Sequence, residues 1–119
     1  MLGKKGIGLT YAWKGLQIAW REEENFQLQG WAAFAVLLFG FFFHLNVLEW
    51  LFVVGAIGAV LTAELLNTAL EELCDMYKAE HDPHVAKIKD LAAAAVFVSS
   101  CAAFATGCIV FIPHLSTLL

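Results

Sequence analysis

The sequence has few charged residues, few prolines and few cysteines. Of its 119 residues, 15% are charged and two are proline. The three cysteines, Cys74, Cys101 and Cys108, form no Cys-x-x-Cys pair, so neither a disulfide framework nor a zinc site is indicated. The seven basic residues form no long basic run and the net charge is −4, which argues against nucleic-acid binding.

Hydrophobic residues are in excess instead, at 61% of the chain, against roughly 45–50% in soluble proteins. Uncharged runs cover residues 25–48, 50–63 and 91–119. A helix needs about 20 residues to cross the roughly 30 Å hydrocarbon layer of a bilayer. The second run is therefore long enough only if its helix continues through the polar residues that follow it.

We predict an all-α integral membrane protein with a single domain, residues 1–119. The segment "KKGIGLTYAWKGLQIAWREEENF" interleaves apolar residues, including two tryptophans, with basic residues, which is typical of an amphipathic helix lying in the membrane interface. Pro113 is expected to end or kink the third span. The surface helix is expected at about residues 5–24, and the three spans at about 28–48, 50–78 and 87–113.

The basic residues predict the orientation. They lie before the first span and between the second and third, and the positive-inside rule then makes the N-terminus and the second connection cytoplasmic. The residues concerned are Lys4, Lys5, Lys14, Arg21, Lys78, Lys87 and Lys89.

A polar stripe follows the short second run, in "TAELLNTALEELCDMYK". At about 100° per residue, Glu64, Asn67, Glu71 and Asp75 share one helix face about 100° wide. Carboxylates inside a membrane are costly unless they face protein or water, so this face should turn toward a bundle interior. A divalent cation would relieve the repulsion between the acids, and carboxylates with substrate phosphates are a usual Mg²⁺ environment.

Two further clusters are expected at the same membrane surface. One is the acidic run Glu22–Glu24 before the first span, and the other is Lys89 with Asp90 at the start of the third. Acids, an amide and a lysine suit phosphoryl transfer, which needs charge neutralisation and a positioned acceptor hydroxyl. The acceptor would be a lipid, because the site opens at the bilayer edge. There is no Walker A motif or kinase-type glycine-rich loop.

Two other readings start from the same residues. Intramembrane acids also mark ion pathways in small transporters or channel subunits, but the outer half offers only Glu49 as a matching acid. In a purely structural membrane protein, polar residues such as Asn67 would hold helices together. That reading leaves three acidic motifs at one depth unexplained.

The segment "AELLNTALEELCD" resembles the signature of the prokaryotic diacylglycerol kinase family, E-x-x-N-[ST]-A-[IL]-E-x-x-x-D, at every fixed position. This family includes the undecaprenol kinases of Gram-positive bacteria. "YAWKGLQIAWREEENF" is similar to the family's surface helix, and "HVAKIKDLAAAAV" to its A-K-x-x-K-D-x-A-A-x-A-V segment. The resemblance covers essentially the whole chain.

The resemblance implies a small homotrimer in the bacterial inner membrane, with composite active sites between subunits on the cytoplasmic side. The reaction it implies transfers the γ-phosphate of ATP, with Mg²⁺, to the hydroxyl of a membrane lipid. Diacylglycerol is the expected acceptor, giving phosphatidic acid, and undecaprenol, giving undecaprenyl phosphate, is the alternative. "AWKGL" resembles the diacylglycerol branch, whereas "HDPHVAKIKD" and "ENF" resemble the Gram-positive branch.

The same resemblance implies roles for individual residues. Glu64 matches the general base, and Asn67 the amide that positions base and substrate. Glu23 and Glu71 match the metal-ligating glutamates. The other positions that match the nucleotide site or its support are Tyr11, Asp75, Glu80, Lys89 and Asp90.

Overall fold

The structure is a computed structural model that describes residues 7–77 and 82–119, and the described residues form four helices. They are α1 (Ile7–Glu22), α2 (Glu24–Phe42), α3 (Val47–Met76) and α4 (Pro83–Leu118). The helices α2, α3 and α4 are each long and apolar enough to cross a membrane. The prediction of an all-α membrane protein with three spans is confirmed.

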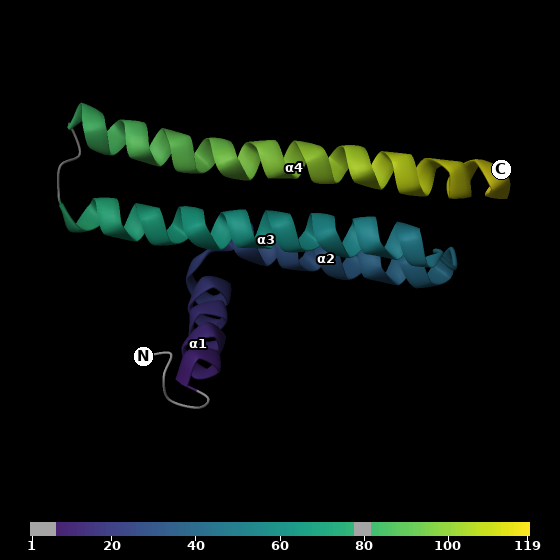
Figure 1. The fold of residues 1–119 in the computed structure, drawn as a ribbon, viewed down its shortest axis with the longest axis horizontal. Coiled ribbons are helices and arrows are strands. Elements are labelled where there is room, and N and C mark those ends of the chain that lie inside the picture. Colours follow the sequence, from purple (N-terminus) through teal and green to yellow (C-terminus); the bar gives the residue numbers. More distant parts are fainter. Residues whose placement is uncertain (1–6, 78–81) are drawn as a thin grey trace.

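The three long helices run side by side, and α1 lies across them. Figure 1 shows α3 and α4 as an antiparallel pair, with α2 beside α3 and α1 nearly at a right angle to the bundle. At about 1.5 Å per residue, the 30 residues of α3 and the 36 of α4 exceed the length needed to cross the hydrocarbon layer. One end of the α3–α4 pair therefore extends past the level at which α1 meets α2.

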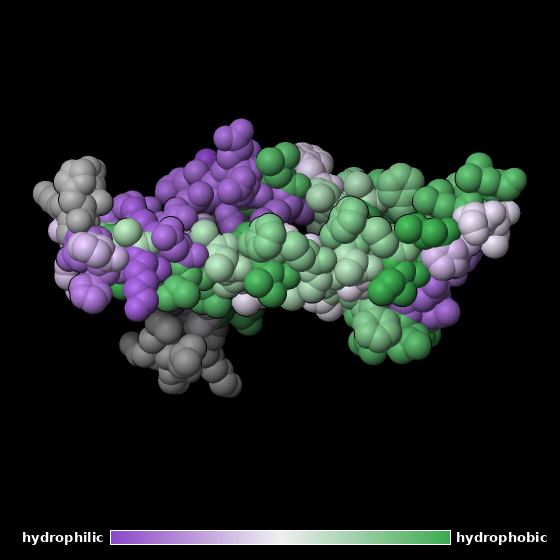
Figure 2. Space-filling model, turned by 90° about the horizontal axis from the view of Figure 1, so that it is seen from above, coloured by the Kyte–Doolittle hydropathy of each residue, from purple (hydrophilic) through white to green (hydrophobic). Residues whose placement is uncertain are grey.

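Most of the apolar surface of the single chain is exposed. Large side chains on α4 such as Phe97, Phe104 and Ile109 are 69–75% exposed. Figure 2 shows hydrophilic residues gathered toward the end where α3 connects to α4, and hydrophobic residues over much of the remaining length. Such a surface is stable in contact with lipid or with other subunits, where burial inside one chain is not required.

The turn between α2 and α3 is defined by local hydrogen bonds. His44 has a positive φ of 55°, and Asn46 begins the next helix through a capping box with Glu49. Asn46 Oδ1 accepts from the Glu49 N–H at 2.8 Å, and Glu49 Oε1 accepts from the Asn46 N–H at 3.0 Å. This box ends the first span earlier than expected: α2 stops at Phe42, and the predicted limit was residue 48.

At the end of the bundle where α2 turns into α3, an ion pair joins α3 to α4. His114 Nε2 lies 3.0 Å from Glu49 Oε2 and 3.2 Å from Glu49 Oε1. The Phe43 ring lies 5.6 Å from the His114 ring. Close by, Leu45, Val53 and Val110 form a small buried cluster.

Helix α4 continues through Pro113 to Leu118, although the sequence was expected to end or kink it at about residue 113. Pro113 has no N–H, so the Ile109 carbonyl, four residues before it, loses its helical partner. Membrane helices tolerate such a proline. In the last turn, the Thr117 hydroxyl donates to the His114 carbonyl at 2.8 Å, and the Ser116 hydroxyl to the Pro113 carbonyl at 3.4 Å.

Some of the other helix bounds differ by a few residues from the expected ones. The surface helix α1 covers Ile7–Glu22 and ends two residues before the expected end at about 24, and α3, Val47–Met76, begins three residues before the expected start at about 50. The expected start of the surface helix at about residue 5 and the expected end of the second span at about residue 78 lie outside the described residues. The start of α4 lies at Pro83, four residues before the expected one, because Asp82 caps it. Asp82 Oδ1 accepts from the His84 N–H at 2.8 Å, and proline at the first helical position needs no donor partner.

Candidate active site

The polar stripe occupies the half of α3 that leads toward α4. Glu64 is 2% exposed and is the buried charged side chain among the residues that the structure describes. This burial is unusual here, because few side chains of the single chain are buried at all. A carboxylate placed inside an apolar bundle marks a functional site by default, since it is expensive to desolvate.

Glu23 joins this stripe from a different part of the chain. It is the one residue between α1 and α2, in extended conformation with φ −114° and ψ 106°, and its side chain makes no capping hydrogen bond. Partial burial, and after it the carboxylates of Glu71, Glu22 and Glu72, raise the pKa of Glu23. The Glu64 carboxylate in turn lies within electrostatic range of Glu23 and Glu71. Three carboxylates from two segments therefore converge.

The orientation of Glu71 is set by Asn67, one helical turn before it. The Asn67 amide donates to Glu71 Oε1 at 3.0 Å. The other side of this amide, Asn67 Oδ1, is buried and has no hydrogen-bond partner among the described residues. A buried acceptor without a partner is costly, so Asn67 is ready to accept a hydrogen bond from a bound molecule.

Helix α4 brings Lys89 to the edge of the same region. Its ammonium group lies 2.8 Å from Asp75 Oδ1, with side-chain exposures of 41% for Lys89 and 65% for Asp75. Lys89 is also within electrostatic range of Glu71. Its neighbour Asp90 is exposed on α4. The exposed pair contributes little to stability, so a ligand can take over the lysine without a large cost.

Among the described residues, one predicted site residue is not brought to the carboxylates of its own chain. Tyr11 lies on α1, three turns before Glu23, is 53% exposed and has the Lys14 ammonium 5.8 Å from its ring centre. Glu80 lies outside the described residues.

The residues present fit a magnesium ion that is shared with phosphate groups. Within residues 7–77 and 82–119, no group of three or more His, Cys, Asp or Glu side chains is arranged to hold a metal by itself. Glu23 and Glu71 supply a pair of carboxylates, which repel each other without a cation between them. Mg²⁺ is usually bound by one or two carboxylates and completed by substrate phosphates and water.

One polar residue near the site was not found by sequence reasoning. Gln29 of α2 lines a cavity of about 200 Å³ between α2, α3 and α4, together with Ser100 and Thr106 of α4 and many apolar side chains. Its Oε1 atom is buried without a partner in the chain. The available signal was a glutamine inside a long uncharged run.

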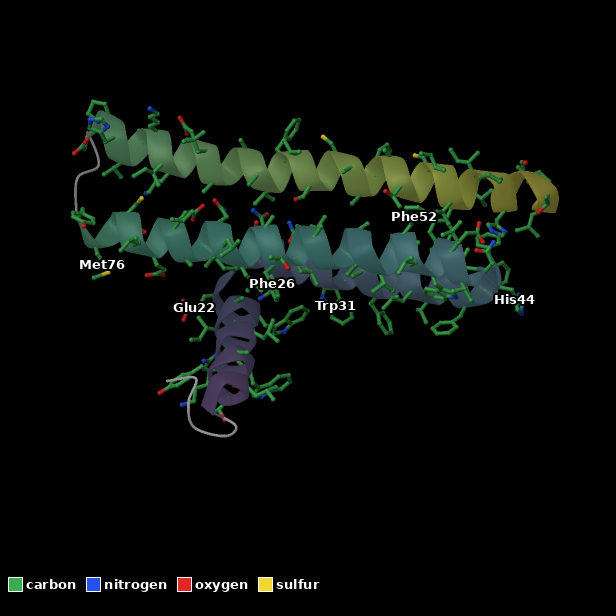
Figure 3. All side chains as sticks on the ribbon, in the orientation of Figure 1. Glu22, Phe26, Trp31, His44, Phe52 and Met76 are labelled. Carbon is green, nitrogen blue, oxygen red and sulfur yellow. The ribbon has the colours of Figure 1, made fainter. Side chains whose placement is uncertain are left out.

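Figure 3 shows Glu22, Phe26 and Trp31 around the junction of α1 and α2, with His44 at the opposite end of the bundle from Met76.

Comparison with known proteins finds relatives that match this chain along most of its length. The chain is 38% identical over 106 residues to the undecaprenol kinase of Bacillus subtilis (strain 168), covering 89% of this chain and 86% of that relative. It is 28% identical over 104 residues to the diacylglycerol kinase of Escherichia coli (strain K12), covering 87% and 85%. A diacylglycerol kinase of Synechocystis is 32% identical over 114 residues, which cover 95% of this chain and 65% of that relative.

Residues 10–111 match the family described as prokaryotic diacylglycerol kinase. The match contains α2 and α3 completely and includes every predicted site residue. The family assignment made from the sequence motifs is confirmed. It favours a kinase over the two alternatives, a transporter or channel subunit and a purely structural membrane protein. The chain belongs to the prokaryotic diacylglycerol kinase family and is an ATP-dependent lipid kinase.

Proposed function

We propose that the chain transfers the γ-phosphate of ATP to the hydroxyl of a membrane lipid at the cluster formed by Glu23, Glu64 and Glu71. The observation that carries this proposal is the convergence of these carboxylates around a buried glutamate, from two separate segments. Phosphoryl transfer depends mainly on positioning and on charge neutralisation, which such a cluster supplies once a divalent cation is bound.

Each residue of the cluster has a distinct role in the proposed mechanism. Glu64 accepts the proton of the lipid hydroxyl, for which it must be ionised and within hydrogen-bond reach of that hydroxyl. Glu23 and Glu71 hold Mg²⁺, which supplies positive charge next to the ATP phosphates. Asn67 holds Glu71 by its amide group and offers its free Oδ1 to the substrate.

The nucleotide is proposed to lie beyond this cluster, toward the end of α3 and the start of α4. Lys89 leaves its exposed ion pair with Asp75 and binds the ATP phosphates, its ammonium group acting as a point charge. Asp90, Asp75 and Glu80 support the nucleotide from the same region. Tyr11 lies away from the carboxylates of its own chain, which supports a site shared between subunits.

A homotrimer with composite sites accounts for the exposed apolar faces of the single chain. The faces of α3 and α4 that carry Gly58, Ala59, Ala92 and Ala95 border a shallow apolar groove, and small residues allow close approach of helices in membranes. We place the protein in the bacterial inner membrane. The basic residues Lys14, Arg21, Lys87 and Lys89 all lie toward the end of the bundle that carries the carboxylates, so this end is proposed to be cytoplasmic.

Diacylglycerol is the acceptor we propose first, with phosphatidic acid as product, because the matching family and several relatives carry this activity in their names. Undecaprenol is the second candidate. It is favoured by the higher identity, 38% against 28%, to the Bacillus subtilis undecaprenol kinase than to the Escherichia coli diacylglycerol kinase.

The test is a kinase assay on the purified protein in lipid vesicles with radiolabelled ATP. Diacylglycerol and undecaprenol are supplied in parallel, and the labelled lipid is separated and quantified at several acceptor concentrations. Label in phosphatidic acid with the higher kcat/KM supports the first acceptor, and label in undecaprenyl phosphate the second. ATP hydrolysis without any labelled lipid would contradict the proposed reaction.

A further inference from the structure

The junction between α1 and α2 turns the chain at a single residue. The Glu23 N–H donates to the Ala19 carbonyl at 2.9 Å, and the Glu23 carbonyl accepts from the Gln27 N–H at 3.1 Å. The N–H and the carbonyl of Glu23 are therefore both hydrogen-bonded despite the bend. Ala19 and Phe26 are buried on either side of it, 3% and 6% exposed. The residue that makes the bend is the same residue whose carboxylate lies within electrostatic range of Glu71.

A tryptophan packed on a glycine holds this bend. A Cβ atom added to Gly30 would lie 2.7 Å from Cζ3 of Trp20, which is closer than real Cβ contacts allow. The Trp31 ring meets Trp20 edge to face at 5.9 Å between ring centres. The Gln27 side-chain amide donates to the Trp20 carbonyl, one of the open carbonyl groups at the end of α1. We call Trp20, Gln27, Gly30 and Trp31 the elbow brace.

The position of the elbow brace relates it directly to Glu23. Gly30 follows Glu23 by seven residues and lies about two turns into α2. Trp20 precedes Glu23 by three residues and is the last ring of α1 before the bend. A change in the angle between α1 and α2 would therefore move the Glu23 carboxylate relative to Glu71, which is held on α3.

We propose that the elbow brace positions the Glu23 carboxylate for metal–nucleotide binding, with Trp20 and Gly30 acting as positioning residues. This inference rests on the proposed function, in which Glu23 and Glu71 share a magnesium ion. In this arrangement a Cβ atom at position 30 overlaps the indole of Trp20, so either the ring or the bend has to move. A side chain there would open the bend and withdraw Glu23, while Glu64 and Glu71 on α3 keep their places.

The test compares two glycine substitutions on the full-length protein in vesicles. Gly30→Ala introduces the close contact with Trp20, whereas Gly15→Ala on α1 meets nothing within 4 Å and is the matched control. The half-saturating Mg²⁺ concentration is measured at fixed nucleotide in two ways, from lipid phosphorylation and from binding of a fluorescent ATP analogue that does not transfer phosphate. We expect Gly30→Ala to raise it on the order of ten-fold, because small displacements of a binding group have large effects. Gly15→Ala should leave it unchanged.

Two further variants separate positioning from a general loss of structure. Trp20→Phe, which lacks the outer ring of the indole, should restore much of the Mg²⁺ affinity when combined with Gly30→Ala. In a Glu23→Gln background, Gly30→Ala should add little, because the brace then has no ligand to position. Full additivity of the two substitutions, or equal behaviour of Gly30→Ala and Gly15→Ala, would overturn the inference.

The outcomes also distinguish this inference from the proposed function. If Glu23→Gln by itself leaves the Mg²⁺ requirement unchanged, the metal role of Glu23 is wrong and the proposed site is wrong with it. If Glu23→Gln raises the requirement and the brace variants do not, only the inference fails. If Gly30→Ala does not assemble, Trp20→Phe takes its place in the double-mutant cycle with Glu23→Gln. Trp20→Phe is expected to raise the half-saturating Mg²⁺ concentration by less than Gly30→Ala, and again to add little in the Glu23→Gln background.

Discussion

Glutamate side chains have opposite surroundings at the two ends of the helical bundle. At one end, Glu64 lies within electrostatic range of Glu23 and Glu71, and partial burial, followed by the charges of Glu71, Glu22 and Glu72, raises the pKa of Glu23. At the other end, Glu49 lies in a capping box and next to His114, so its carboxylate is fully partnered. Glutamates placed together against electrostatics indicate a binding site for a cation, whereas a partnered glutamate indicates a structural role.

The largest effect that sharpens this comparison is expected from Glu64→Gln. The amide keeps the shape of the side chain but cannot accept the proton of the lipid hydroxyl, so kcat should fall by roughly 10²- to 10⁴-fold. The measurement is lipid phosphorylation at saturating Mg²⁺, ATP and lipid. Assembly by size-exclusion chromatography should be unchanged. Turnover comparable to that of the unsubstituted protein would remove Glu64 from the role of base.

Glu71→Gln should act on the metal more than on the chemical step. Loss of one carboxylate weakens the proposed magnesium site, so the half-saturating Mg²⁺ concentration should rise by on the order of ten-fold or more. A Mg²⁺ titration of lipid phosphorylation measures it, with Glu72→Gln on the neighbouring position as the control. An identical titration curve for Glu71→Gln would contradict its assignment as a ligand.

The pH dependence of the Mg²⁺ requirement should follow the raised pKa of Glu23. Below this pKa the side chain holds a proton that the metal must displace, so the half-saturating Mg²⁺ concentration should fall as pH rises through it and then level off. Because burial, and after it the neighbouring carboxylates, raise the pKa of Glu23, the stability of the metal-free protein should also fall as pH rises from the ordinary value of 4.5 through the raised one. Glu23→Gln should flatten both dependences, and an unchanged pH profile in that variant would argue against this cause.

The smallest effect on turnover is expected at the opposite end. His114→Gln removes the ion pair with Glu49, which links the start of α3 to the end of α4, so the thermal midpoint should drop by a few degrees. The kcat and the Mg²⁺ requirement should stay unchanged at temperatures where the variant is folded. A loss of turnover in folded His114→Gln would break the comparison, because it would make the far end part of the active site.

The helices and the polar stripe could be predicted because they are local patterns. Uncharged runs and the 100° spacing were enough to place three spans and to turn Glu64, Asn67 and Glu71 to one face. The end of α2 at Phe42 depends on a capping box that begins the next helix. The continuation of α4 through Pro113 was not predicted, because a proline in the sequence signals a helix end or kink, whereas a helix in a membrane can continue through it.

The long-range contacts had no signal in the local pattern. Glu49 and His114 are separated by 65 positions, and only the antiparallel packing of α3 on α4 brings them together. The partner of Glu71 came from a family resemblance, since no periodicity connects residue 23 with a helix that begins at Val47. The packing of Trp20 on Gly30 likewise appears only when α1 and α2 are placed in space.

The sequence by itself determined that this chain crosses the membrane three times and carries acids on one face of its second span, because hydrophobic length and helical periodicity are properties of neighbouring residues. The tertiary structure alone decided that Glu23 faces that stripe and that Glu49 finds a histidine. The physical reason is that the charge on a carboxylate is stabilised or opposed by groups within a few ångströms, whichever part of the chain supplies them.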